Sequence, residues 1–180
     1  EGWRMEKLVV IINGTGGAGK DTLCELAGHR YRVKNISAIT PIKKIAAENG
    51  WDGGKDGKSR KFLADLKQLF VAYNDLPNRY LMEEYRRFLD SRDQILFVHI
   101  REGSEIDKFK KGVDIPCVTL LVHKNFGEQV VWGNPSDDLV EQYPYDYQYN
   151  NEKALEQAED DFAAFLGKIM KEKGVQRGQA

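Results

Sequence analysis

The chain has 180 residues and a formal net charge of −1, so it is long enough for one domain with a buried core and shows no basic excess that would favour nucleic acid as a partner. Its two cysteines, Cys24 and Cys117, lie far apart and match no metal-binding or redox spacing, so a reducing, cytoplasmic setting is expected. The sequence contains no run of about 18 apolar residues and no signal-peptide pattern, so neither a membrane span nor export is indicated.

The first predicted elements surround a glycine-rich loop. An apolar run at 8–12 predicts a buried strand, and a helix is expected from Lys20 to about His29. Between them stands Gly14-Thr15-Gly16-Gly17-Ala18-Gly19-Lys20, and this strand–loop–helix context gives the pattern G-x-x-x-x-G-K a physical meaning. The glycines let consecutive backbone N–H groups turn into one concavity, where the helix N-terminus stabilises phosphate oxygens. Lys20 would reach the outer phosphates as a point charge. The residues expected to bind the phosphates are Gly14, Thr15, Gly16, Gly17, Ala18, Gly19, Lys20 and Thr22.

Asp21 stands directly after the lysine, where the common form of this loop carries a Ser or Thr whose hydroxyl binds Mg²⁺. A carboxylate is also a hard oxygen ligand for Mg²⁺, so Asp21, with Thr22 behind it, is the candidate metal ligand. The alternative is that Asp21 is favoured only as an acidic residue in the first turn of the helix, where the helix dipole stabilises negative charge. Both roles can hold together.

The rest of the chain alternates predicted strands and helices. In chain order these are a strand at 31–39, helices at 42–48, 59–73 and 78–89, a strand at 95–100, a helix at 104–111, strands at 117–122 and 145–149, and a helix at 152–173. Continuous apolar runs in the strands indicate burial on both faces, as in a parallel sheet covered by helices. The alternation predicts a three-layer α/β fold around an open, five-stranded parallel sheet, with ligands at the carboxyl ends of its strands. Helix 59–73 is expected to bury one apolar stripe, made of Phe62, Leu63, Leu66, Phe70 and Tyr73.

Residues 14–22, read as G-x-x-x-x-G-K-D-T, resemble the P-loop of the phage-type deoxynucleoside monophosphate kinases, within the nucleoside monophosphate kinase superfamily. Phosphomevalonate kinases of the P-loop type carry a similar G-K-D. Further stretches are similar to motifs of the phage-type kinases and follow in the same order, namely 37–43 (S-A-I-T-P-I-K), 51–60 (W-D-G-G-K-D-G-K-S-R), 134–137 (N-P-S-D) and 145–151 (Y-D-Y-Q-Y-N-N). Each is short, but together they cover most of the chain.

The resemblance implies one P-loop kinase domain over residues 1–180. Its core would comprise 5–39 and 95–175, with an acceptor-binding helical insertion at 40–94 and a lid at 124–143. The activity implied is ATP-dependent phosphoryl transfer to a nucleoside or deoxynucleoside monophosphate, with Mg²⁺ as the metal.

The resemblance also implies roles for individual residues. Lys20, Asp21 and Arg101 would be catalytic, and Lys124 at the start of the lid would contact the nucleotide. Basic residues and one aromatic residue of the insertion would bind the acceptor, namely Lys43, Trp51, Lys58, Arg60 and Arg79.

The sequence departs from the resembled pattern in two places. The third strand of such kinases usually carries D-x-R, but here His99 stands two residues before Arg101. We expect His99 to be a hydrogen-bonded strand histidine rather than a metal ligand, with Glu102 or Glu105 as substitutes for the missing acid. Segment 125–152 contains no Lys or Arg, whereas kinase lids usually bring arginines onto the transferring phosphoryl group.

Two alternatives therefore stay open. The acceptor could be another small metabolite, such as phosphomevalonate, dephospho-coenzyme A or a sugar acid. The chain could also be a nucleotide-binding module with little transferase activity, which the arginine-free segment and His99 would favour. The oligomeric state does not follow from the sequence.

Overall fold

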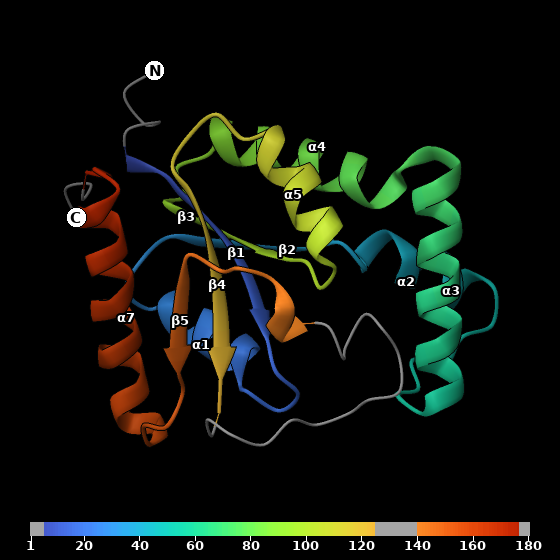
Figure 1. Ribbon diagram of the computed structural model, residues 1–180, viewed down its shortest axis with the longest axis horizontal. Coiled ribbons are helices and arrows are strands. Elements are labelled where there is room, and N and C mark those ends of the chain that lie inside the picture. Colours follow the sequence, from blue (N-terminus) through green and yellow to red (C-terminus); the bar gives the residue numbers. More distant parts are fainter. Residues whose placement is uncertain (1–5, 125–139, 177–180) are drawn as a thin grey trace.

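Strands that are apolar on both faces must be covered by other elements on both sides. The computed structural model in Figure 1 describes residues 6–124 and 140–176 and places helices on both faces of a sheet. Its centre is a parallel sheet of five strands in the order β2-β3-β1-β4-β5. The strands are β1 (Leu8–Gly14), β2 (Val33–Ser37), β3 (Ile95–His99), β4 (Cys117–His123) and β5 (Tyr147–Asn150). The predicted five-stranded parallel sheet is thus confirmed, with β2 and β5 at its edges.

The helices agree with the predicted ones to within a few residues at each end. They are α1 (Lys20–Ala27), α2 (Thr40–Glu48), α3 (Gly57–Asn74), α4 (Leu76–Asp90), α5 (Gly103–Lys111) and α7 (Leu155–Glu172), and a short 3₁₀ turn, η2 (Val140–Gln142), precedes β5. Within the described part of the chain, no helix combines the length and the apolar character that a bilayer crossing requires.

Alternate side chains of β1 divide the core into two halves. Leu8, Val10 and Ile12 pack with residues of α1 and α7, including Phe162. Val9 and Ile11 pack on the other face with residues of α4 and α5, among them Phe88 and Phe109. Each such side chain contributes roughly 1.5–3 kcal/mol when fully buried. The result is the predicted three-layer α/β arrangement.

The segment between β2 and β3 contains α2, α3 and α4. Helix α4 packs on the sheet, with Leu81, Tyr85 and Phe88 buried in the second half of the core. Helix α3 stands on the opposite side of the molecule from α7 (Figure 1) and packs against α2 and α4.

The predicted apolar stripe of α3 is wrong in part. Phe62 is 42 % exposed and Tyr73 is 84 % exposed, and the one buried residue of the helix is Lys67. Leu63, Leu66 and Phe70 are partly buried. The inward face of α3 is centred nearer to Lys67, however, so Phe62 and Tyr73 at the far edge of the stripe lie outside it. The helix instead buries Lys67 against Glu102 and Glu105, which follow β3 in the chain.

Candidate active site

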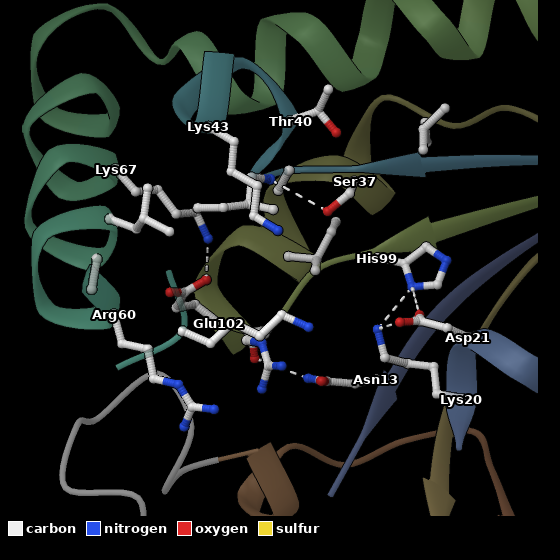
Figure 2. A pocket seen from close by; sticks show the side chains of 18 of the residues that line it. Asn13, Lys20, Asp21, Ser37, Thr40, Lys43, Arg60, Lys67, His99 and Glu102 are labelled. Atoms are coloured by element: carbon white, nitrogen blue, oxygen red, sulfur yellow. Dashed lines mark hydrogen bonds and ion pairs between the residues drawn. The ribbon is translucent and has the colours of Figure 1, made fainter. Parts of the chain in front are cut away.

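The carboxyl ends of β1, β2 and β3 open onto a cavity of about 690 Å³ that lies between these strand ends and helices α2 and α3 (Figure 2). Ligands of open parallel α/β sheets bind at this edge, and the volume suits a small molecule. The glycine-rich loop contributes Gly16, Gly17, Lys20 and Asp21 to one wall. The other walls come from the ends of β2 and β3, from α2 and α3, and from the loop between these two helices.

The glycine-rich loop has the backbone geometry of a phosphate cradle. Gly17 and Gly19 have φ values of 72° and 76°, which side chains rarely tolerate. A Cβ atom on Gly19 would also approach Asn151 Nδ2 to 2.7 Å, because that amide donates a hydrogen bond to Ala18 O at 2.8 Å. Hydrogen bonds among the described residues leave the N–H groups of Gly16 and Gly17 without an acceptor. Together with the N-terminus of α1, these groups are suited to an anion.

Lys20 points into the cavity toward His99 and Asp21 (Figure 2). Its Nζ lies 2.8 Å from His99 Nδ1 and 3.5 Å from Asp21 Oδ1. The other ring nitrogen of His99, Nε2, lies 3.1 Å from Asn35 Oδ1 on β2. An ammonium group can only donate, so Nδ1 accepts and Nε2–H donates to Asn35. The expectation of a hydrogen-bonded strand histidine is confirmed.

Burial determines the charge state of this pair. It is the main cause that lowers the pKa of Lys20. The pKa of His99 is lowered from 6.5 to about 4, mainly by burial and also by the nearby charges of Lys20 and Arg101, while Asp21 opposes the shift. His99 is therefore neutral at physiological pH and leaves the positive charge on Lys20. A neutral partner holds the ammonium without competing for it as strongly as a carboxylate would, so phosphate oxygens can take its place.

The depressed pKa of His99 makes the stability of the ligand-free protein depend on pH. Between pH 6.5 and pH 4 the unfolded chain binds a proton at this histidine and the folded chain does not, so the free energy of unfolding should fall by roughly 3 kcal/mol as the pH falls through this window. The free energy of unfolding can be measured in urea at several pH values for the wild type and for His99→Gln, whose side chain does not titrate. The wild type should lose stability relative to the variant as the pH falls through this window. Parallel curves would contradict the assignment.

Asp21, the predicted metal ligand, lines the cavity beside the glycine-rich loop. Its side chain is 83 % exposed, and Oδ1 also lies 3.8 Å from His99 Nδ1. Among the described residues, no group of three or more His, Cys, Asp or Glu side chains could hold a metal. Mg²⁺ is commonly bound through one or two carboxylates together with substrate phosphates and water, so a single exposed carboxylate beside the cradle fits it. Thr22 is exposed and is not part of the cavity wall.

The acceptor candidates divide into two groups. Lys43, Trp51 and Arg60 line the cavity, whereas Lys58 and Arg79 are exposed and lie outside its wall. In Figure 2, Lys43 reaches in from α2 and Arg60 from the start of α3. Trp51 is half-buried, and its indole N–H is buried without a hydrogen-bond partner among the described residues.

Two lysines of the cavity wall were not predicted. Lys55 lies in the loop between α2 and α3. It belongs to the stretch 51–60 that is similar to a motif of the phage-type kinases, so the sequence could have indicated it. Lys67 lies within the predicted helix 59–73 but beside its predicted apolar stripe, and no local pattern identified it.

Lys67 forms a buried ion-pair cluster at the back of the cavity. Its Nζ contacts the Glu102 carboxylate and lies 2.9 Å from Glu105 Oε2. Burial raises the pKa of Glu105, and Lys67 opposes this shift. Glu105 Oε1 is buried without a partner among the described residues. Both acids that we considered as metal ligands are therefore held by Lys67 and fasten α3 to the residues after β3.

Arg101, which we predicted to be catalytic, lines the cavity at the end of β3, and its contact with the transferring group stays a prediction. Lys124 follows β4 directly, is exposed and is not part of the cavity wall. Most of the predicted lid at 124–143, including the motif at 134–137, lies outside the described residues.

No protein-family model matches the sequence, and no curated protein matches it. Solved structures do match the fold. A proposed kinase from Chloroflexus aurantiacus J-10-fl gives a TM-score of 0.56 at 11 % sequence identity, covering 93 % of this chain and 98 % of its own. TT1252 from Thermus thermophilus gives 0.51 at 20 % identity, covering 90 % and 97 %. A gluconokinase from Sinorhizobium meliloti 1021 gives 0.50 at 16 % identity, covering 92 % and 94 %. With its five-stranded parallel sheet, the chain has the fold of the P-loop kinases.

Proposed function

We propose that this chain is an ATP-dependent kinase that transfers the γ-phosphoryl group of ATP to a nucleoside or deoxynucleoside monophosphate. The observation that carries the proposal is that one cavity joins the P-loop wall, with Lys20 and Asp21, to an opposite wall that presents Lys43 and Arg60. Cations on the side away from the P-loop favour an acceptor that already carries a phosphate group. Trp51 in the same wall favours an acceptor with a flat, apolar part.

The residues of the cavity suit phosphoryl transfer because this reaction needs positioning and charge neutralisation more than covalent help from the protein. Lys20 would bind the β- and γ-phosphates on the N–H groups of the P-loop. Asp21 would hold Mg²⁺, which supplies further neutralisation of the phosphate oxygens when bound. An oxygen of the acceptor phosphate would attack the γ-phosphorus as the bond to the β–γ bridging oxygen breaks, with Arg101 stabilising the charge that develops. ADP would then leave with that oxygen.

The release of ADP in the presence of different acceptors tests the proposal. A coupled assay would compare nucleoside and deoxynucleoside monophosphates with phosphomevalonate, dephospho-coenzyme A and gluconate. We expect ADP release to depend on one of the monophosphates. Dependence on one of the other compounds would keep the kinase and replace the acceptor. ATP binding with no acceptor-dependent release would instead identify a nucleotide-binding module.

Arg60→Ala should raise the KM for the acceptor by about ten- to hundredfold, the effect of losing a charged hydrogen bond. The value of kcat should change little, since this contact is expected in both the ground state and the transition state. Lys58→Ala provides the matched control, because Lys58 lies only two residues away but outside the cavity wall. Equal effects of the two substitutions would show that the acceptor responds to the general charge of α3 rather than to Arg60.

Asp21→Asn should raise the Mg²⁺ concentration needed for half-maximal rate, because an amide oxygen is a weaker ligand for a hard cation than a carboxylate oxygen. Titrating MgCl₂ at a fixed, saturating concentration of ATP measures this. The melting temperature of the variant without nucleotide should stay close to that of the wild type, since the side chain is exposed. An unchanged Mg²⁺ dependence would remove Asp21 from the metal site.

A further inference from the structure

Asn13, the last residue before the P-loop motif, is only 1 % exposed and uses every hydrogen-bonding group of its amide. Its Nδ2 donates to Arg101 O and to Tyr145 Oη, both at 3.0 Å. Its Oδ1 accepts from Gly14 N–H, also at 3.0 Å. Tyr145 Oη in turn donates to Val140 O at 2.7 Å. One side chain thus connects the P-loop, the turn after β3 and the segment that leads into β5.

The orientation of this amide follows from its neighbours. Gly14 N–H needs an acceptor and Arg101 C=O needs a donor, so the oxygen must face Gly14 and the nitrogen must face Arg101. An aspartate of the same shape keeps the bond to Gly14 but places an oxygen against the Arg101 carbonyl. Of these two residues of equal shape, only asparagine can satisfy all three partners.

The turn that carries Arg101 is held from both sides. Asn13 binds the carbonyl of Arg101 itself, and Lys67 binds the carboxylate of the next residue, Glu102. His99, two residues earlier, accepts a backbone hydrogen bond from Ala38 at 3.1 Å. These contacts fix the backbone from which the Arg101 side chain enters the cavity, at a defined place relative to Gly14.

We propose that Asn13 is a positioning residue, which holds the Arg101 turn in register with the P-loop so that the guanidinium meets the phosphoryl group carried by that loop. This inference rests on the proposed kinase function. A displacement of about 1 Å in such a group costs roughly a hundredfold in rate, so a side chain that sets the distance between loop and arginine controls kcat without touching the substrate.

A double-mutant cycle of Asn13→Ala and Arg101→Ala tests the proposal. Asn13→Ala should lower kcat about ten- to hundredfold and change the KM for ATP less than about threefold. In the Arg101→Ala background the same substitution should lower kcat less than about twofold, because the group that Asn13 positions is gone. Asn74→Ala, at an exposed asparagine at the end of α3, should leave kcat unchanged. Equal losses in both backgrounds, or a KM that rises as much as kcat falls, would overturn the proposal.

Tyr145→Phe separates the two bonds that the amide donates. It removes the contact toward 140–145 and keeps the bond to Arg101 O, so kcat should fall by less than about threefold. A loss as large as that of Asn13→Ala would assign the effect to segment 140–145 and reject Arg101 as the target. If Asn13→Ala does not fold, Asn13→Asp of equal shape takes its place in the cycle.

Hydrogen exchange gives a readout that does not need activity. In Asn13→Ala, peptides that cover 101–105 and 140–145 should both exchange faster, while peptides from α7 should not change. Unchanged exchange in the first peptide would overturn the proposal. If the wild type transfers phosphate to no acceptor, the proposed kinase function fails, and the exchange experiment still decides whether Asn13 holds the Arg101 turn.

Discussion

Arg101→Ala is expected to lower the kcat of phosphoryl transfer by about three powers of ten, the lower end of what an arginine on a transferring phosphoryl group contributes. The KM for ATP should rise by less than about tenfold, because the contact is made mainly in the transition state. The reason for so large an effect is that Arg101 lines the cavity at the end of β3, whereas segment 125–152 has no Lys or Arg to replace it.

Two further variants make the Arg101 result specific. Lys20→Ala should lower kcat and also weaken the binding of ATP, since Lys20 would contact the phosphates before and during transfer. Arg87→Ala removes an exposed arginine that pairs with Glu83 and Glu84 on its own helix, α4, and should leave kcat unchanged. If Arg101→Ala lowers the melting temperature but leaves turnover per folded molecule intact, Arg101 is structural and the nucleotide-binding module becomes the better proposal.

Lys67→Ala is expected to lower the free energy of unfolding by about 3–5 kcal/mol, the usual cost of removing one partner from a buried ion pair. Lys67 is 5 % exposed and faces the carboxylates of Glu102 and Glu105, so its removal takes away a buried cation that both carboxylates share. Lys61→Ala on the same helix removes an exposed pair with Asp65 and should cost less than about 1 kcal/mol.

The pH dependence of the Lys67 variant provides its own control. Lys67 opposes the rise that burial causes in the pKa of Glu105, so without Lys67 this carboxyl should take up a proton at a higher pH. Protonation removes the uncompensated charge, and the deficit in stability should therefore shrink as the pH is lowered. A deficit of equal size at pH 5 and pH 8 in urea unfolding would point to lost packing of the lysine stem instead.

The fold and the P-loop were accessible from the sequence because their signals are local. A continuous apolar run, a glycine pattern and a helix start lie within residues 8–22 and need no knowledge of the rest of the chain. The contacts that complete the site are not local. Asn13 bonds to residues 88 and 132 positions away, and Lys20 meets His99 across 79 positions, so no spacing in the sequence could reveal either.

The sequence also could not show which of the predicted acceptor-binding residues line the cavity, even where these residues are close together in the chain. Lys58 and Arg60 belong to one predicted motif, yet residues two apart on a helix point about 200° away from each other. Only Arg60 lines the cavity. The sequence identified the helix and its basic residues, but only the placement of α3 decides which side faces the strand ends. For the same reason the apolar pattern of α3 predicted burial for Phe62 and Tyr73, which remain exposed.

The position of β1 at the centre of the sheet has a consequence for how the protein is made. Of the five strands of the sheet β1 is synthesised first, but its two neighbours, β3 and β4, begin at Ile95 and Cys117. At about 5–20 residues per second, the ribosome needs roughly 5 to 20 seconds to supply them. During that interval the apolar run Leu8–Ile12 has no strand to pair with. The P-loop, which follows β1, is therefore not fixed on a paired strand until β3 and β4 have been translated, and in the meantime an unpaired apolar strand is a site at which the nascent chain can aggregate.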